Sequence, residues 1–433
     1  MNNPNLKKFS EIKTRIFFTL ALLVIYRFGT YLPIPGVDPV VMEQLLNQNS
    51  EGLLGIFNMF SGGAFGRMSV FALAIMPYIT ASIVMQLLTV LVKPLEELKK
   101  SGDNGRKKIS NYTRFLTIFI TAIQGIAVAL SLEAKMAVVE PGLIFQISAV
   151  TSLVGGTMFL MWLGEQITAR GVGNGISIII FAGIVAELPS ALSATLLMSK
   201  TGELSSLVII FLLCIVFGLI LFIVFIEKSV RRVIIQYPKR QRGNKIYGGD
   251  KSFIPLKINT AGVIPPIFAS ALLLFPITLA NYNFTDSSED ELSWLEVISS
   301  YLSHGSVAYI LLYVVLIVFF SFFYTTIVFN PKDTADNLRK NGGFVPGYRP
   351  GASTEKYFTT ILSRLTVIGS IYLSFVCIVP ELLIVNYNVQ FYLGGTSLLI
   401  VVNVVIDTFT QIQSHIYANK YENIINKSNL RKT

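Results

Sequence analysis

Positive charge in this chain is confined almost entirely to alternate loops between long apolar segments. When the intervening loops are assigned alternately to two sides, one side holds 31 of the 35 Lys and Arg residues. The opposite side holds only Arg27, Arg67, Lys135 and Lys200. Because Lys and Arg accumulate in cytoplasmic loops, this distribution predicts a membrane protein with many spans and with both termini in the cytoplasm.

Ten apolar segments are predicted to cross the membrane as helices. Each is close to the ~20 residues that a helix needs to cross a hydrocarbon core of ~30 Å. They lie at 16–32, 69–92, 115–132, 143–164, 175–196, 205–226, 258–280, 306–329, 361–380 and 391–412. The composition agrees, because 14% charged residues is well below the ~25% of soluble domains. The net charge of +10 fits basic loops beside anionic lipid headgroups.

The ten spans divide into five in residues 1–204 and five in residues 205–433. An odd number of spans in each half means that the second half enters the membrane in the opposite direction. Such inverted repeats usually place the working site between the halves, near the bilayer midplane. Two cytoplasmic loops, 227–257 and 330–360, are long and basic, and loops of this length are often functional.

One apolar segment, residues 53–66, is too short to span the membrane. As a helix its 14 residues would reach only about 21 Å, and Ser61-Gly62-Gly63 would interrupt that helix. Two interpretations remain open on these grounds: an interfacial helix, or a re-entrant plug. Irregular backbone is tolerated at membrane depth only inside protein or beside a water-filled cavity, so a plug would imply a cavity.

The spans hold few candidate ionisable groups, namely Asp407, Glu165 and Glu227, and these fall near span ends. Ion-coupled transporters need such groups along their pathways, so a small-solute secondary transporter is disfavoured but stays open as the alternative function. No metal-ligand cluster, phosphate-binding loop or nucleophile motif occurs, so the sequence indicates no enzyme, no cofactor and no metal site.

Several motifs in order along the chain resemble the bacterial members of the SecY/Sec61 alpha family of protein translocation channels. They cover roughly residues 10–430 and read FNMFSGG at 57–63, IMPYITAS at 75–82, WLGEQIT at 162–168, GNGIS at 173–177, NTAGVIP at 259–265, ADNL at 335–338, PGYRPG at 346–351 and GGTSLLI at 394–400. The resemblance implies an all-α polytopic protein with ten transmembrane helices. It also implies two inverted five-helix halves around a central pore, which a re-entrant plug fills. The implied function is to conduct unfolded polypeptides across the membrane and to release apolar segments sideways.

The resemblance also assigns a ring of isoleucines to the waist of the pore. By motif position these are Ile75, Ile79, Ile176, Ile180, Ile267 and Ile400. The spacing agrees, because Ile75 with Ile79 and Ile176 with Ile180 are i, i+4 pairs that share one helix face. A ring of stiff apolar side chains can block ions by excluding water.

The same resemblance implies a plug, a lateral gate and a docking surface. The plug would be residues 53–67, with Phe57, Asn58, Met59, Phe60, Ser61, Gly62 and Gly63 at its centre. The gate, between spans 2–3 and 7–8, would hold Thr80, Gln86, Asn259 and Phe275, whose polar members could bond across it. Docking residues for a motor or ribosome would be Lys239, Arg240, Arg242, Lys245 and Arg349. Relatives often have two arginines where this chain has Asn244-Lys245, which halves the charge there.

The implied location is the bacterial plasma (inner) membrane. The implied partners are the small membrane subunits SecE and SecG, the SecA motor ATPase, the ribosome, YidC, SecD/SecF, precursor polypeptides and anionic lipids.

Overall fold

The computed structural model describes residues 4–38, 41, 58, 61–201, 205–238, 240–242, 245–247, 251–282, 306–387 and 394–430. Each of the ten predicted spans coincides with a helix in this part of the chain. These helices are α1 (Pro4–Gly29), α4 (Met76–Leu91), α6 (Asp103–Ala134), α7 (Leu143–Arg170), α8 (Gly175–Thr201), α9 (Ser206–Lys228), α10 (Ile264–Tyr282), α12 (Val307–Val328), α14 (Ala352–Tyr387) and α15 (Gly395–Leu430).

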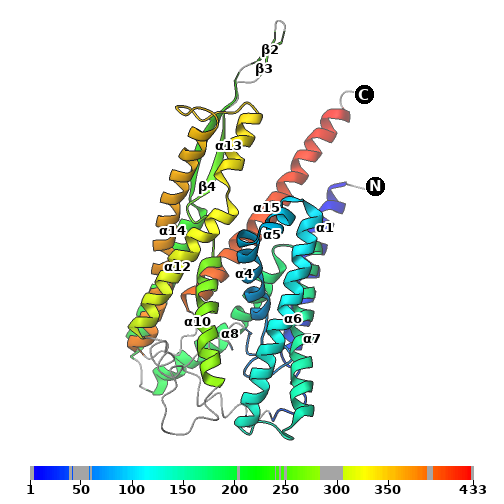
Figure 1. Ribbon diagram of the computed structural model, residues 1–433, viewed down its shortest axis with the longest axis vertical. Coiled ribbons are helices and arrows are strands. Elements are labelled where there is room, and N and C mark those ends of the chain that lie inside the picture. Colours follow the sequence, from blue (N-terminus) through cyan, green and yellow to red (C-terminus); the bar gives the residue numbers. More distant parts are fainter. Residues whose placement is uncertain are drawn as a thin grey trace.

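Seven of the described helices are long and apolar enough to cross a membrane. An eighth candidate is the pair α4 and α5 (Lys93–Lys100), which bends by 99° at their junction. Figure 1 shows the start of α1 and the end of α15 at the same end of the molecule. The chain is therefore a helical, multi-pass membrane protein whose ends lie on one side, as the charge distribution predicts.

The cytoplasmic loop 227–257 contains strands, which the all-α prediction did not include. β1 (Val230–Gln236) pairs antiparallel with β4 (Lys251–Lys257), and β2 (Arg240–Arg242) pairs with β3 (Lys245–Tyr247). The β2–β3 pair forms the tip of a long projection at the end where the termini lie (Figure 1). The run Val-Ile-Ile at 233–235 favours a strand, because β-branched residues suit a pleated surface.

The loop 330–360 also contains regular secondary structure. Helix α13 (Pro331–Lys340) occupies its first part, and α14 already begins at Ala352. Backbone hydrogen bonds in both directions between Gln236 and Phe344 join it to β1. An apolar cluster fills the space between the two loops and consists of Val233, Ile235, Leu256, Leu338, Val345, Phe358 and Leu365. The two long loops, 227–257 and 330–360, therefore form one folded unit, which we call the cytoplasmic unit after its predicted side of the membrane.

Helix α6 packs against α7 through a face of small residues. Thr113, Thr117, Thr121, Gly125 and Ala129 recur every four residues along α6 and are buried. The three threonine hydroxyls each donate to the carbonyl four residues earlier, so no hydroxyl needs a partner outside the helix. Small side chains let membrane helices approach closely, which leaves room at Gly125 for the α7 side chain Leu153.

The second span is shorter than predicted. The expected span 69–92 contains α4 only from Met76, and residues 69–75 form consecutive turns instead. These turns are buried, and the backbone N–H of Val70 donates to the Leu32 carbonyl. Average hydropathy cannot separate buried turns from a helix, because both need apolar side chains.

Candidate functional site

A narrow apolar cavity lies between helices of the two halves. It is lined by Ala74, Ile75, Met76, Ile79, Ile180, Ile267, Ser270 and Ile400. Its volume of about 10 Å³ leaves room for no more than about one water molecule. Five of the six predicted ring isoleucines therefore meet at one constriction, contributed by the start of α4, by α8, by α10 and by α15.

The sixth predicted ring residue, Ile176, does not line this cavity. It packs against Gly164 of α7, where an added Cβ would lie 3.1 Å from the Ile176 Cγ1. The reason is axial position, because four residues correspond to about 6 Å along a helix. Ile180 lies at the constriction and Ile176 lies one turn closer to the cytoplasmic end of α8.

The described part of the predicted plug consists mostly of buried turns, at residues 61–66. It comprises Asn58 and residues 61–67, which we call the plug segment; Phe57, Met59 and Phe60 lie outside the described residues. The Asn58 Oδ1 accepts a hydrogen bond from the Gly66 N–H at 2.7 Å, and the Ser61 Oγ accepts one from the Phe65 N–H at 2.9 Å. All of residues 61–66 are buried, which fits a re-entrant segment within the protein better than an interfacial helix.

Two groups beside the plug segment were not singled out from the sequence. The Arg27 guanidinium on α1 donates to the Gly62 carbonyl, and Glu187 lies within α8, inside the predicted span 175–196. The statement that ionisable groups occur only near span ends needs this correction. Two signals in the sequence could have identified them. Glu187 is a carboxylate within an apolar span, and Arg27 is one of only four Lys and Arg residues assigned to the outer side.

Two of the predicted gate residues, Thr80 and Gln86, lie on α4. Asn259 lies just before α10 and Phe275 lies within α10, and α4 and α10 contact each other. Their hydrogen bonds, however, stay within each half. The Thr80 hydroxyl donates to the Met76 carbonyl, and the Gln86 Nε2 donates to the Ser82 hydroxyl, both within α4. Among the described residues no hydrogen bond joins these side chains to Asn259, so the expected polar contact across the gate is absent. The side chain of Phe275 lies outside the described residues.

Gln86 carries a hydrogen-bond acceptor that no described group uses. Its Oε1 is buried and has no hydrogen-bond partner among the described residues. A buried acceptor without a partner costs about 1–3 kcal/mol.

Asn259 is held from the other side, by Glu227 at the end of α9. The Asn259 Nδ2 donates to the Glu227 Oε1 at 2.7 Å and to the Gly262 carbonyl at 3.0 Å, and the Tyr372 hydroxyl donates to the same Glu227 Oε1 at 3.4 Å. Asn259 and Glu227 are only 3% and 5% exposed. This cluster fixes the start of α10 where the cytoplasmic strand pair β1–β4 joins the helices.

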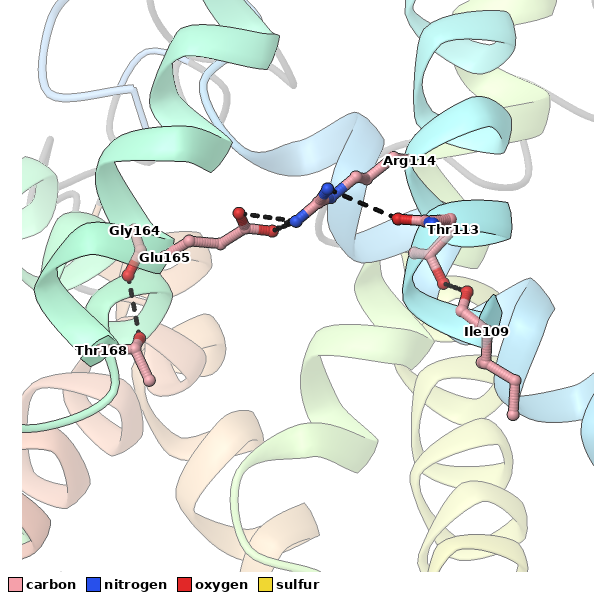
Figure 2. A network of polar contacts seen from close by, with 7 residues as sticks. Ile109, Thr113, Arg114, Gly164, Glu165 and Thr168 are labelled. Atoms are coloured by element: carbon pink, nitrogen blue, oxygen red, sulfur yellow. Dashed lines mark hydrogen bonds and ion pairs between the residues drawn. The ribbon is translucent and has the colours of Figure 1, made fainter. Parts of the chain in front are cut away.

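A second polar cluster joins α6 to α7 (Figure 2). The Arg114 Nη2 lies 2.7 Å from Oε1 and 2.8 Å from Oε2 of Glu165, and Figure 2 shows the two side chains reaching toward each other from neighbouring helices. Charge-assisted pairs of this kind hold their two partners in one geometry. The pair therefore attaches α6 to α7, its neighbour in the same half.

The two halves are attached to each other away from the gate. α15 packs along α8, and the Gly173 N–H donates to the Gln411 Oε1 at 2.9 Å. The adjacent Val172 N–H donates to the Thr19 hydroxyl at 3.2 Å, a bond within the N-terminal half that attaches α1 to this segment. The hydrogen bond from Gly173 to Gln411 thus joins the two halves where α15 packs along α8, whereas among the described residues no hydrogen bond joins α4 to α10.

The predicted docking residues occupy the cytoplasmic unit. Arg349 is exposed in a turn whose Gly347 and Gly351 have φ of +87° and +108°, and the Thr354 hydroxyl donates to its carbonyl at 2.9 Å. Such φ values favour glycine, so the turn shape is encoded by the PGYRPG motif. Arg240 and Arg242 lie in β2, and Lys245 lies in β3. The structure does not describe the side chains of these three residues, and Lys239 lies outside the described residues.

Comparison with known proteins places this architecture in a family. The SecY family model matches residues 69–409. The chain is 54% identical to the protein translocase subunit SecY of Rickettsia bellii over 99% of both chains. It is 49% identical to the corresponding Escherichia coli protein, over 97% of this chain and 95% of that one.

Solved structures share the fold at lower identity. One described as a protein conducting channel has a TM-score of 0.64 at 18% identity and covers 93% of this chain and 92% of its own. Another structure, described in terms of a SecY plug domain that stabilises the closed channel, has a TM-score of 0.62 at 19% identity, with the same coverage. The canine Sec61 ribosome–channel complex gives 0.60 at 18% identity, again with that coverage. The chain therefore belongs to the SecY family.

Proposed function

We propose that this chain is the channel-forming subunit of a bacterial protein translocase, without catalytic activity of its own. It moves unfolded secretory polypeptides across the plasma membrane and releases apolar segments sideways into the bilayer. The observation that carries this proposal is the constriction where Ile75, Ile79, Ile180, Ile267 and Ile400 meet. Family membership and the names of the relatives agree with it.

The constriction acts as a gasket. Apolar walls around a space of about one water molecule resist wetting, so ions do not cross. Isoleucine side chains form no directed bonds with a passing chain, and the ring therefore tolerates any unfolded sequence. The plug segment adds a second barrier on the outer side when no polypeptide is present.

Sideways release follows from the unequal attachment of the two halves, which we take to be residues 1–204 and 205–433. The α8–α15 side is held by packing and by the hydrogen bond from Gly173 to Gln411 and acts as the hinge side, while α4 and α6 separate from α10 and α12 as the gate. A segment in the open gate then partitions between channel and lipid. Each Leu, Ile, Phe or Val gains ~0.3–0.6 kcal/mol in lipid, whereas a central charge costs ~2.5–3.5 kcal/mol.

The cytoplasmic unit is the docking surface for the partners that supply the polypeptide. We assign this role to the exposed Arg349 and to the basic tip formed by β2 and β3. The β2–β3 pair projects from one end of the molecule (Figure 1). The partners are the SecA motor and the ribosome, with SecE and SecG as membrane subunits. Both termini then lie in the cytoplasm, because they share that end of the molecule.

Replacing Arg349 by glutamate is expected to lower precursor transport roughly tenfold, because a charge reversal at a docking contact costs ~1.4 kcal/mol or more. The measurement is transport of a secretory precursor into vesicles that contain the complex and the motor. Lys356→Glu is the matched control, since Lys356 is also exposed at the start of α14. If both variants lost precursor transport to the same extent, the assignment of Arg349 to the docking surface would be wrong.

A small-solute transporter is the alternative function. The channel and transporter functions can be distinguished by comparing uptake into vesicles that contain the complex with uptake into empty vesicles. The channel reading predicts uptake of an unfolded precursor that depends on its signal sequence and on the motor. Ion-coupled accumulation of a small solute, without precursor uptake, would favour the transporter.

A further inference from the structure

Two side chains at the outer end of α1 hold the plug segment by its backbone. The Arg27 Nη1 donates to the Gly62 carbonyl at 2.5 Å, and the Tyr26 hydroxyl donates to the Ser61 carbonyl at 3.3 Å. Tyr26 is 1% exposed, and its ring stacks on Phe71 with centroids 6.3 Å apart. Both donors therefore have fixed positions, and both contact main-chain atoms of the plug segment.

The plug segment is shaped to lie close to the opposite wall, formed by α8. Gly62 and Gly63 have φ of +66° and +80°, conformations that side chains rarely adopt. A Cβ on Gly62 would lie 2.9 Å from the Gly183 Cα, and a Cβ on Gly63 would collide with the Glu187 carboxylate. The two glycines thus allow the plug segment to sit between α1 and α8 with no side chain in the way.

Within the plug segment the hydrogen bonds are local. Asn58 bonds to Gly66, and Ser61 bonds to Phe65, so these contacts would survive if the segment moved as one piece. The bonds from Tyr26 and Arg27 are different, because they join the segment to the channel wall. They would have to break whenever the segment leaves.

The position of Arg27 is itself fixed by Tyr31. The Arg27 guanidinium lies 5.3 Å from the centroid of the Tyr31 ring, and its Nη2 donates to the Tyr31 hydroxyl at 3.5 Å. Arg67, at the end of the plug segment, lies over the same ring at 4.2 Å. One ring therefore connects the cation on the wall with a cation of the plug segment.

We infer that Tyr26 and Arg27 form a clasp that positions the plug segment in the closed channel and sets how often it leaves. This inference deepens the proposed function, on which it rests, by naming the contacts that regulate the seal. A hydrogen bond from a charged donor is worth about 1.5–3 kcal/mol, which corresponds to a tenfold or larger change in the closed-to-open ratio. Arg27 is accordingly the principal positioning residue and Tyr26 the weaker one.

The test measures how often the plug segment is exposed. Ser61 is 1% exposed, so a cysteine placed there by Ser61→Cys is shielded while the channel is closed. Cys214→Ser and Cys377→Ala remove the two native thiols. The complex in membrane vesicles is then treated with a maleimide that cannot cross the membrane, applied from the outer side, and the labelling rate is recorded.

In this background Arg27→Gln is expected to raise the labelling rate about tenfold or more, because the charged donor is lost. Arg27→Lys, which keeps a charged donor, is expected to restore much of the parent rate. Tyr26→Phe keeps the ring and should give a smaller increase, about twofold to fivefold. Lys135→Gln is the matched control, since it removes another outer cation far along the chain, and it should leave the rate unchanged.

Equal labelling in the Arg27→Gln and Lys135→Gln variants would overturn the clasp. If Arg27→Gln does not accumulate in the membrane, the Tyr26→Phe variant decides, and an unchanged rate there overturns the clasp as well. The proposed function is tested separately, by placing a photo-crosslinking probe at Ile400 and looking for crosslinked adducts with an arrested secretory precursor. Adducts at Ile400 together with unchanged labelling would mean that the channel is correct and the clasp is wrong.

Discussion

Deleting residues 57–65 is expected to raise the ion conductance of the reconstituted channel complex roughly tenfold or more. The deletion removes the plug segment from the outer side of the constriction, so that the isoleucine ring alone must exclude water. It also removes the backbone carbonyls that Tyr26 and Arg27 bind. The measurement is the current across a planar bilayer that contains the purified complex without precursor.

The deletion variant should still transport precursor, because the ring and the gate remain. Transport into vesicles is therefore the control for folding, run on the same preparation. Conductance equal to that of the parent chain, in a preparation that still transports, would show that this segment lies at the interface and does not seal the channel.

The second large effect is expected at the ring. Ile400→Asn places a hydrogen-bonding group at the constriction, where Ile400 is 2% exposed and faces the isoleucines of α4, α8 and α10. A polar group lowers the barrier to wetting, and we expect a roughly tenfold increase in ion leak in the plug-deleted background. Conductance is again the measurement.

Ile400→Leu is the matched control because it keeps the volume and the apolar surface, and such exchanges are usually tolerated. Its leak should stay within about twofold of the parent. If Ile400→Asn and Ile400→Leu leaked equally, the constriction would owe its seal to packing elsewhere and not to the apolar character of this position.

The membrane architecture could be predicted from the sequence because two strong physical constraints act on it. Lipid demands ~20 apolar residues per helix, and loop charge sets orientation. All ten predicted spans coincide with described helices. The error at residues 69–75 arose because turns buried in protein need the same apolar side chains as a helix in lipid.

Local periodicity predicted part of the ring. Ile180 and Ile176 share a face of α8, but only Ile180 reaches the constriction. The depth of each helix relative to its neighbours depends on packing between distant segments, such as Ile176 against Gly164. A pattern within one helix carries no information about that depth.

The polar contacts could not be predicted, because each joins residues far apart in the chain. Asn259 was expected to bond across the gate, yet Glu227, at the other end of the loop between them, holds it instead. The Arg27 bond to Gly62 uses a main-chain carbonyl, which leaves no mark on the sequence. The cytoplasmic strands were missed for a related reason, since their apolar cluster combines both long loops.

Site-specific photo-crosslinking at Ile400 tests the central claim most directly. The probe is placed at Ile400 in a membrane-embedded complex that holds an arrested secretory precursor, and separately at Val405, which is 51% exposed on the same helix α15. The account predicts precursor adducts at Ile400 that require a functional signal sequence, and none at Val405. Absence of adducts at Ile400 while precursor is bound at the cytoplasmic unit, or equal adducts at both positions, would contradict a polypeptide path through the isoleucine ring.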